Sequence, residues 1–187
     1  MGPNLGTPAE CRFCHRDRFA FAQTIALGAY DGELKSAITR GKDAPAEPLL
    51  GELGRVLYSF RRDLLNELKL DLIVPIPQHW TSRMLRSHNP AEILAARIAG
   101  LLEVPLEIRV LRKKRMTPRQ SSLLPSQRRA NLKGAFVAKR KGKIMGRRIL
   151  LVDDVLTTGA TANECAKALK QAGADEIFVA VTSRGLG

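Results

Sequence analysis

Residues 149–161, with the sequence ILLVDDVLTTGAT, restrict the fold of this chain more than any other segment. The first four residues are branched and apolar, which is typical of a short strand that is buried on both faces. Two aspartates and a loop rich in threonine follow, and Gly173 closes a helix that is predicted over residues 160–172. A buried strand that passes through a loop into a helix is the repeating unit of an open α/β sheet, in which ligands bind at the carboxyl ends of the strands.

The rest of the chain predicts more elements of the same kind. Apolar residues recur at helical spacing over residues 49–68, and Asn89 with Pro90 is a good start for a helix over residues 91–102. Strands are predicted at residues 23–30, near 71–76, around 106 and 110, and at 134–138, 148–152 and 176–183. Strands that alternate with helices indicate an α/β fold with a mostly parallel sheet flanked by helices. The length of 187 residues suits one such domain, over residues 23–187, with a short N-terminal appendage over residues 1–22.

Two adjacent aspartates at the end of a buried strand require compensation. The carboxylates of Asp153 and Asp154 repel each other and lose hydration, so hydroxyl donors or a cation must stabilise them. A ribose offers two neighbouring hydroxyls, and Mg²⁺ is a cation that prefers oxygen ligands. The threonines and the glycine that follow precede the free N–H groups of the next helix, and this arrangement binds phosphate. An acidic strand end with an ordinary helix cap is the alternative interpretation.

The whole motif resembles the fingerprint with which type I phosphoribosyltransferases bind 5-phosphoribosyl 1-pyrophosphate (PRPP). The resemblance implies the type I phosphoribosyltransferase fold and a site for PRPP together with Mg²⁺. It implies that Asp153 and Asp154 hold the 2′- and 3′-hydroxyls of the ribose, directly or through hydrated Mg²⁺, and that the following loop holds the 5-phosphate. The residues implied in PRPP binding are Asp153, Asp154, Val155, Leu156, Thr157, Thr158, Gly159, Ala160 and Thr161.

A pyrophosphate loop is expected after the strand that ends in VPIP, at residues 74–77. Hydrogen-bond donors suited to a pyrophosphate follow within nine residues, namely Gln78, His79, Thr81, Ser82, Arg83 and Arg86. A proline turn with a few surface basic residues explains the segment equally well. If the segment binds pyrophosphate, the residues expected to form the loop are Ile76, Pro77, Gln78 and Arg83.

Three further segments resemble the ComF family, the phosphoribosyltransferase-like proteins associated with DNA uptake in competent bacteria. The first is GAYDGELKSAITRGK at residues 28–42, which is similar to the stretch that precedes the first domain helix in that family. The second is VPIP followed by RSHNPAEILAARIA at residues 86–99, and the third is RMTPRQSSLLPSQRRANLKGAF at residues 115–136. The sequence RSHNP at residues 86–90 departs from the family pattern, which usually has Arg-Gly-Phe-Asn-Gln. Together with the PRPP motif, the segments cover most of residues 23–187 in order.

The excess positive charge lies in one segment. Residues 109–148 contain 15 Lys and Arg and no Asp or Glu, whereas the remainder holds 16 basic and 18 acidic residues. Such a segment attracts polyanions in a salt-dependent way, although a solvated surface loop is the alternative. Residues 109–131 are expected to form a mobile basic loop that closes over the substrate, and the family pattern implies Arg115 and Gln120 as catalytic residues beside the two aspartates. Binding of single-stranded DNA is assigned to Lys113, Lys114, Arg119, Arg128 and Arg129.

The N-terminal appendage contains Cys11 and Cys14 at the place of the last pair in the four-cysteine zinc element that the ComF family tends to carry. A structural zinc ion needs four ligands, so the two residues are either half of a zinc site or two free thiols. The odd number of three cysteines points to a reducing compartment. Because no apolar run approaches the ~20 residues that span a bilayer, we expect no membrane insertion and a cytoplasmic location. The oligomeric state stays open, and a homo-oligomer is one of the options.

Three functions fit these features. The first is a ComF-type protein linked to DNA uptake, in which the PRPP·Mg site serves ligand sensing or an unfamiliar reaction. The second is a conventional phosphoribosyltransferase of nucleotide metabolism that acts on an unidentified base or amine. A PRPP-responsive transcriptional regulator is the third, but the sequence has no helix-turn-helix pattern to support it. Whether the protein is an enzyme is therefore left open at this point.

Overall fold

The computed structural model describes residues 19–42, 47–78, 88–114 and 132–185. Its main sheet has four strands in the order β1–β6–β5–β2, and each neighbouring pair is parallel. The strands are β1 (Gln23–Ala29), β2 (Leu72–Pro75), β5 (Arg148–Leu156) and β6 (Glu176–Arg184). All four strands therefore end at one edge of the sheet, and the central pair β5–β6 ends beside the segments that follow β1 and β2.

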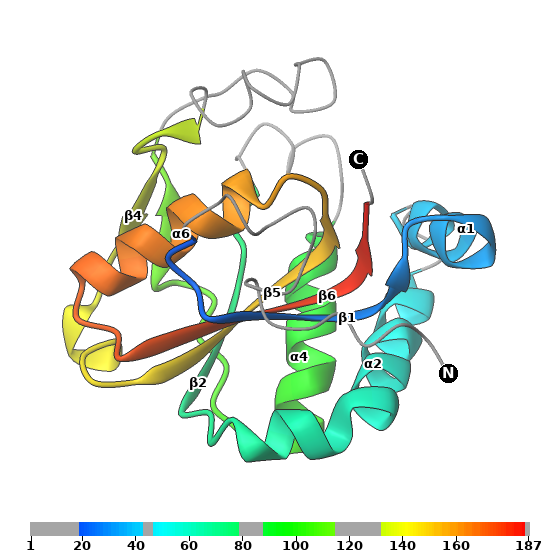
Figure 1. The fold of residues 1–187 in the computed structure, drawn as a ribbon, viewed down its shortest axis with the longest axis horizontal. Coiled ribbons are helices and arrows are strands. Elements are labelled where there is room, and N and C mark those ends of the chain that lie inside the picture. Colours follow the sequence, from blue (N-terminus) through cyan, green and yellow to red (C-terminus); the bar gives the residue numbers. More distant parts are fainter. Residues whose placement is uncertain (1–18, 43–46, 79–87, 115–131, 186–187) are drawn as a thin grey trace.

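Helices cover both faces of this sheet (Figure 1). One face carries α2 (Glu47–Glu67) and α4 (Pro90–Leu102), with α1 (Gly32–Gly41) packed against α2. The other face carries α6 (Ala160–Gln171) and a small antiparallel ribbon of β3 (Leu111–Lys113) and β4 (Phe136–Ala138). A short 3₁₀ helix, η3 (Lys141–Lys143), lies between β4 and β5. The expected α/β fold with a mostly parallel sheet flanked by helices is confirmed.

Strand β5 contributes to both hydrophobic cores, because its side chains alternate between the two faces of the sheet. Ile149 and Leu151 pack in the core under α6, whereas Leu150 and Val152 pack in the core under α2 and α4. All four side chains are fully buried. At ~2 kcal/mol for each buried branched side chain, this strand is a large contributor to the stability of the domain. The prediction of a strand buried on both faces is confirmed.

The predicted helix starts and stops are visible in local geometry. The Asn89 side chain accepts a hydrogen bond from the N–H of Ala91 (3.2 Å), and Pro90 is the first residue of α4. Gly173 has a φ of 96°, a left-handed conformation that favours glycine just after a helix. These two features fix where α4 begins and where the chain turns from α6 into β6.

Two segments differ from the expectation. The stretch 28–42, expected to precede the first helix, itself contains α1, in which Ile38 and Gly41 are buried and Leu34 and Ala37 are partly buried against the core. The expected basic loop over residues 109–131 begins with a strand, because Leu111 to Lys113 pair with β4 and Leu111 is buried in the core. In the described part of the chain, no helix combines the length and the apolar character needed to cross a membrane.

Candidate functional site

The two aspartates lie in the last part of β5, at the carboxyl edge of the sheet. They were expected just beyond the strand, but the ladder with β6 continues past them, through Val155 opposite Ser183 and Leu156 opposite Arg184. Leu156, expected to belong to the site, points its side chain into the core and is 6% exposed. The aspartates are therefore held by a regular strand on one side, and this restricts how far they can move.

Each aspartate has a defined set of partners. The N–H of Asp154 donates to Oδ1 of Asp153 (2.9 Å), and the N–H of Val155 donates to Oδ1 of Asp154 (2.8 Å). The hydroxyl of Thr182 on β6 donates to the carbonyl oxygen of Asp154. Nζ of Lys42, at the end of α1, lies 2.6 Å from Oδ2 of Asp154. Lys42 is thus a cationic neighbour of the acid pair in the described structure, and the sequence alone did not indicate a role for it.

The carboxyl group of Asp153 is affected mainly by burial, whereas that of Asp154 makes an ion pair. Burial raises the pKa of Asp153 well above its ordinary value, the charge of Asp154 raises this pKa further, and the charge of Lys42 lowers it. Burial also raises the pKa of the Cys165 thiol on α6, and the charge of Asp153 adds to that rise. Asp153 is therefore electrostatically close to α6, whereas Asp154 makes its ion pair on the side of α1. Cys165 is a free, buried thiol on α6.

Replacing Asp153 by asparagine is expected to stabilise the ligand-free protein at neutral pH. Because the pKa of Asp153 is raised on folding, the contribution of this group to stability is fully present below the ordinary aspartate pKa and is lost as the pH rises through the folded-state pKa. The advantage of Asp153→Asn should then grow with pH to ~1 kcal/mol and level off. Urea unfolding between pH 4 and pH 8 measures it, with the exposed Asp175→Asn as a control. A variant that is less stable at every pH contradicts the expectation.

The loop between β5 and α6 consists of Thr157, Thr158 and Gly159. Gly159 has a φ of 71°, the left-handed conformation that a glycine adopts without strain. It accepts a hydrogen bond from the N–H of Asn163 (2.8 Å) through its carbonyl group, while the hydroxyl of Thr158 lies 3.4 Å from the N–H of Ala160. The first N–H groups of a helix have no carbonyl partner within it, so this loop presents donors to an anion.

Residues 19–21, which precede β1, contact this loop. The sequence alone did not predict this contact. The N–H of Ala20 donates to Oδ1 of Asn163 in α6 (2.8 Å). The ring of Phe19 stacks on that of Phe21 and lies so close to Gly159 that a Cβ atom there would be 3.1 Å from it. The only sequence signal was the aromatic patch before β1. Residues 19–21 therefore fix the position of the glycine in the loop.

The expected pyrophosphate element is described only in part. Ile76 follows β2, and its N–H donates to the carbonyl group of Val152 (2.8 Å), which places it beside the acid pair. The Asn89 side chain lies 3.4 Å from the Ile76 carbonyl oxygen. Pro77 and Gln78 follow and are half-buried, whereas Arg83 lies outside the described residues. Among the described residues, the buried Oε1 of Gln78 has no hydrogen-bond partner.

The remaining predicted residues divide into two groups. Arg115, Gln120, Arg119, Arg128, Arg129, Cys11 and Cys14 lie outside the described residues. Lys113 and Lys114 are described. Lys113 is half-buried, with its ammonium group 5.8 Å from the centre of the Phe136 ring, and Lys114 is exposed just after β3.

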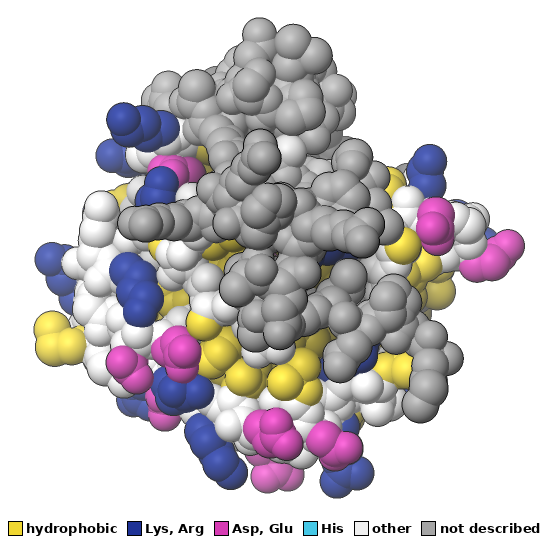
Figure 2. Space-filling model, in the orientation of Figure 1, with side chains coloured by type: hydrophobic (Ala, Val, Ile, Leu, Met, Phe, Trp, Pro, Cys, Tyr) yellow, Lys and Arg dark blue, Asp and Glu magenta, His cyan; other side chains and the backbone are white. Residues whose placement is uncertain are grey.

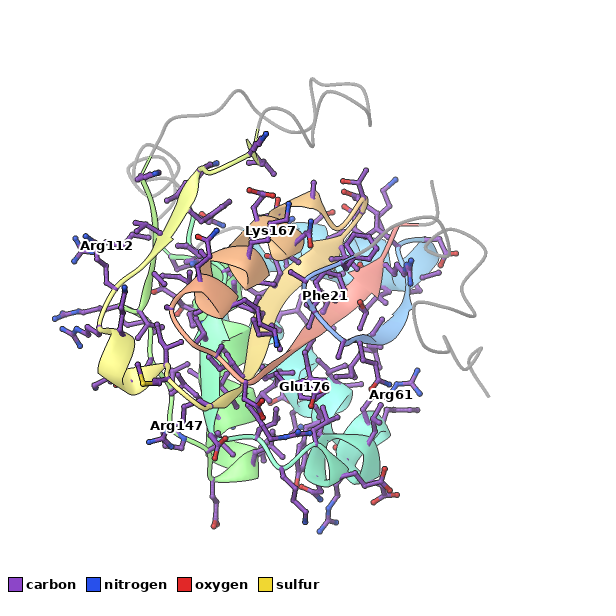
Figure 3. All side chains as sticks on the ribbon, turned by 60° about the vertical axis from the view of Figure 1, so that its left-hand side comes forward. Phe21, Arg61, Arg112, Arg147, Lys167 and Glu176 are labelled. Atoms are coloured by element: carbon purple, nitrogen blue, oxygen red, sulfur yellow. The ribbon has the colours of Figure 1, made fainter. Side chains whose placement is uncertain are left out.

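Exposed basic side chains gather along the ribbon and η3. Figure 2 shows several Lys and Arg side chains on the side where Figure 1 draws the ribbon, and in Figure 3 Arg112 and Arg147 project outward there. We call this the basic surface, and its exposed members are Arg109, Arg112, Lys114, Lys133, Lys139, Arg140, Lys141, Lys143 and Arg147. Glu107 offsets part of the charge through ion pairs with Arg140 and Lys143. The positive charge predicted for this segment is therefore displayed at the surface.

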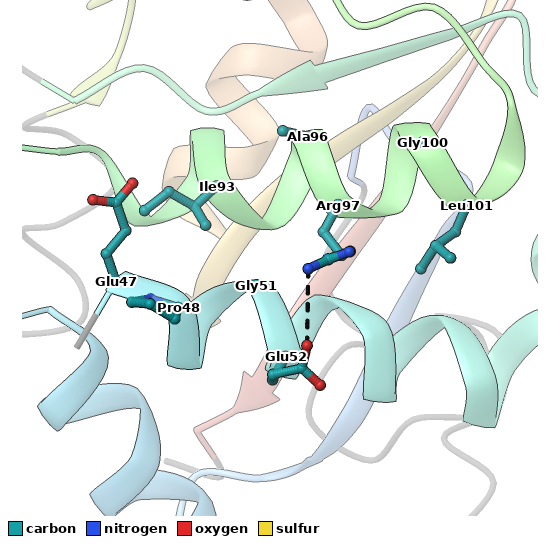
Figure 4. Close-up of a pocket in the computed structure, with 9 residues that line it drawn as sticks. All are labelled: Glu47, Pro48, Gly51, Glu52, Ile93, Ala96, Arg97, Gly100 and Leu101. Atoms are coloured by element: carbon teal, nitrogen blue, oxygen red, sulfur yellow. Dashed lines mark ion pairs between the residues drawn. The ribbon is translucent and has the colours of Figure 1, made fainter.

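A groove of about 870 Å³ lies between α2 and α4 (Figure 4). Ile93 and Leu101 line it, and the ion pair between Arg97 and Glu52 (3.8 Å) crosses it. Gly54 lets the two helices pack closely, because a Cβ atom there would lie 3.3 Å from the carbonyl oxygen of Leu94 on α4. None of the predicted site residues lines this groove, so it is separate from the acid pair and the loop before α6.

The acid pair fits a cation that arrives with ligands of its own. In the regions that the structure describes, no three His, Cys, Asp or Glu side chains form a cluster that could hold a metal ion. Mg²⁺ usually takes one or two carboxylates from the protein and completes its shell with water and substrate phosphates. Asp153 and Asp154 suit that mode of binding, in which the cation enters with a phosphorylated ligand.

The chain is similar to known proteins in sequence. Residues 86–186, which include β5, the loop and all of β6, match the model of the phosphoribosyl transferase domain. The chain is 33% identical over 174 residues to "Competence protein F" of Haemophilus influenzae, covering 91% of this chain and 76% of the relative. It is 32% identical over 190 residues to "DNA utilization protein YhgH" of Escherichia coli O157:H7, covering 95% of this chain and 81% of the relative.

Solved structures that resemble the chain include a purine phosphoribosyltransferase from Pyrococcus horikoshii. The two are 16% identical with a TM-score of 0.43, and the match covers 86% of this chain and 87% of that one. The family match, which covers more than half of the chain, defines a phosphoribosyl transferase domain. Within that class, the chain belongs to the family of competence protein F, the ComF family that its motifs predicted.

Proposed function

We propose that this protein binds PRPP together with Mg²⁺ at the carboxyl edge of the sheet. The observation that supports the proposal most strongly is the three-residue connection from Leu156 at the end of β5 to Ala160 at the start of α6. It sets the acid pair beside a helix opening, so that one ligand can meet both. A sugar diol satisfies the carboxylates, and a phosphate on the same sugar satisfies the N–H groups and threonine hydroxyls.

The roles proposed for the described residues follow from their contacts, and those of Arg83, Arg115 and Gln120 follow from the sequence pattern. Asp153 and Asp154 accept hydrogen bonds from the ribose hydroxyls, directly or through water on the cation. Thr157, Thr158 and the N–H groups from Gly159 to Thr161 bind the 5-phosphate. Gln78 is proposed to donate to the pyrophosphate from its main-chain N–H and its side-chain amide, helped by Arg83, while Ile76 and Pro77 hold the loop in place through the hydrogen bond of the Ile76 N–H to Val152. Arg115 and Gln120, also outside the described residues, are proposed to cover the bound ligand.

If the protein is a transferase, C1 of the ribose loses pyrophosphate as an incoming nitrogen atom bonds to it. Bound Mg²⁺ would supply charge that stabilises the departing pyrophosphate. The chain itself orients the sugar by its diol and its 5-phosphate, so that C1 is held in one position relative to both groups. No residue needs to form a covalent bond with the ligand.

The relatives are named for competence and for DNA utilization, and we propose that this protein likewise serves the uptake or use of DNA. A conventional phosphoribosyltransferase is the second candidate. Pyrophosphate release from PRPP, measured with a panel of bases and amines and repeated with single-stranded DNA present, separates them. Turnover with a small acceptor favours the conventional enzyme. Binding without turnover, altered by DNA, favours the first.

The basic surface is expected to bind single-stranded DNA through its phosphates. Replacing Arg112, Lys114 and Lys139 by alanine should weaken DNA binding at low salt. It should also reduce the slope of log K against log salt by about 2, because each phosphate contact contributes about 0.7 on a single strand. Fluorescence anisotropy with an oligonucleotide at four salt concentrations measures both.

The matched control neutralises Lys35, Arg40 and Arg62, three exposed basic residues of α1 and α2 that lie on the other side of the sheet. It removes the same charge and should leave the slope unchanged. Equal losses in the two triple variants would mean that net charge, rather than the basic surface, is responsible.

A further inference from the structure

The position of Lys42 is determined by packing at the end of α1. A Cβ atom on Gly41 would lie 2.9 Å from Leu50 of α2, so only glycine allows the two helices to approach this closely. The ring of His88, just before α4, lies 3.3 Å from the carbonyl oxygen of Gly41. Ile38, one turn earlier, is fully buried under the same helices. The backbone of Lys42 is therefore held in place by three helices before its side chain meets the acid pair.

The Lys42 side chain then reaches an oxygen that the ligand needs. Its ammonium group contacts Oδ2 of Asp154, while Oδ1 of the same carboxylate already accepts the N–H of Val155. The ion pair is largely shielded, since the side chains of Lys42 and Asp154 are 24% and 16% exposed. A ribose hydroxyl or a hydrated cation that binds Asp154 must share this oxygen with the ammonium group or displace it.

We propose that Lys42 is a PRPP-binding residue whose ammonium group moves from Oδ2 of Asp154 to an anionic oxygen of the pyrophosphate when the ligand binds. This inference rests on the proposed function. The 5-phosphate and the pyrophosphate lie at opposite ends of the ribose. With the 5-phosphate at the opening of α6, the pyrophosphate lies toward the other side of the acid pair, where Lys42 enters. Lys42 stabilises the crowded carboxylates when the site is empty and the pyrophosphate when it is full.

Lys42→Met tests this, because methionine keeps much of the side-chain volume and loses the charge. Calorimetry with PRPP and Mg²⁺ should show an affinity about 10- to 100-fold below wild type, the value of one charge-assisted hydrogen bond. Ribose 5-phosphate lacks the pyrophosphate, so its affinity should change less than about threefold by the same reasoning. Lys42→Arg, which keeps the charge, should retain most of the PRPP affinity.

A metal titration provides a readout that a purely structural role would not produce. Mn²⁺ without PRPP, followed by electron paramagnetic resonance, should bind Lys42→Met more tightly than wild type, because the acid pair has lost its cation. Lys35→Met on the same helix, seven residues and about 10 Å earlier, is the control for lost charge.

Each outcome decides the question. If wild type binds PRPP and Lys42→Met binds it equally well, the inference is wrong. If the variant loses PRPP, ribose 5-phosphate and Mn²⁺ together, Lys42 only supports the fold and the inference is again wrong. If wild type binds no PRPP, the proposed function fails instead, and the Mn²⁺ titration still shows whether Lys42 is the counter-ion of the acid pair.

Discussion

Asp153→Ala combined with Asp154→Ala is expected to lower the affinity for PRPP·Mg by about 10²- to 10⁴-fold, which calorimetry would register as loss of binding. The reason is that two carboxylates each give up a charge-assisted hydrogen bond of about 1.5–3 kcal/mol to the sugar or its cation. The protein should remain folded, because the change removes two crowded charges, one of which is destabilised by burial.

The matched control for this variant removes two carboxylates elsewhere. Asp63→Ala with Glu67→Ala, both exposed on α2, lowers the negative charge by the same amount. This control should bind PRPP·Mg as wild type does. An acid-pair variant that is folded and binds with unchanged affinity would remove the basis for the proposed site.

Gly159→Val is expected to lower the affinity for PRPP·Mg and for ribose 5-phosphate by about 100-fold, with little selectivity between them. A branched residue is strained at a φ of 71°, by about 1–2 kcal/mol or more, and its Cβ would meet the ring of Phe19 at 3.1 Å. The loop must then move, and the N–H groups at the start of α6 lose the arrangement that binds phosphate. Calorimetry with the two ligands measures the effect.

Gly146→Val separates this effect from backbone strain in general. Gly146 has a φ of 69°, nearly that of Gly159, but nothing lies within 4 Å of its would-be Cβ, and it precedes β5 rather than following it. Gly146→Val should lower the free energy of unfolding by an amount similar to the backbone strain of Gly159→Val, and it should leave the affinity for both ligands unchanged. Were both variants to lose affinity equally, the loss would come from general destabilisation and not from the phosphate loop.

The elements of this fold that are local in sequence could be predicted. Four branched apolar residues in a row predicted strand β5, because a strand that is covered on both faces has no polar side. Asn89 and Pro90 predicted where helix α4 begins. Helix α1 was not predicted, because its ten residues include only three large or branched apolar side chains or alanines. A strand was predicted around residue 110, where β3 begins, but the run of basic residues conceals its pairing with β4.

The site could be predicted only where it is continuous in the chain. Asp153 to Thr161 form one segment, so their proximity follows from covalent connection. The contact between Lys42 and Asp154 joins residues far apart in the sequence, through the packing of α1 on α2, and no local pattern reports it. The only signal was that the family-like stretch 28–42 ends on a lysine. The contact between Phe19 and Gly159 was hidden for the same reason.

The central claim is that one sugar phosphate meets both the acid pair and the opening of α6. A crystal structure of the protein with PRPP and Mg²⁺ tests it most directly. We predict ribose hydroxyl density at Asp153 and Asp154, with the 5-phosphate in hydrogen-bond contact with main-chain N–H groups from Gly159 to Thr161. A ligand seated in the groove between α2 and α4, or a 5-phosphate on the basic surface with the acid pair untouched, would contradict the account.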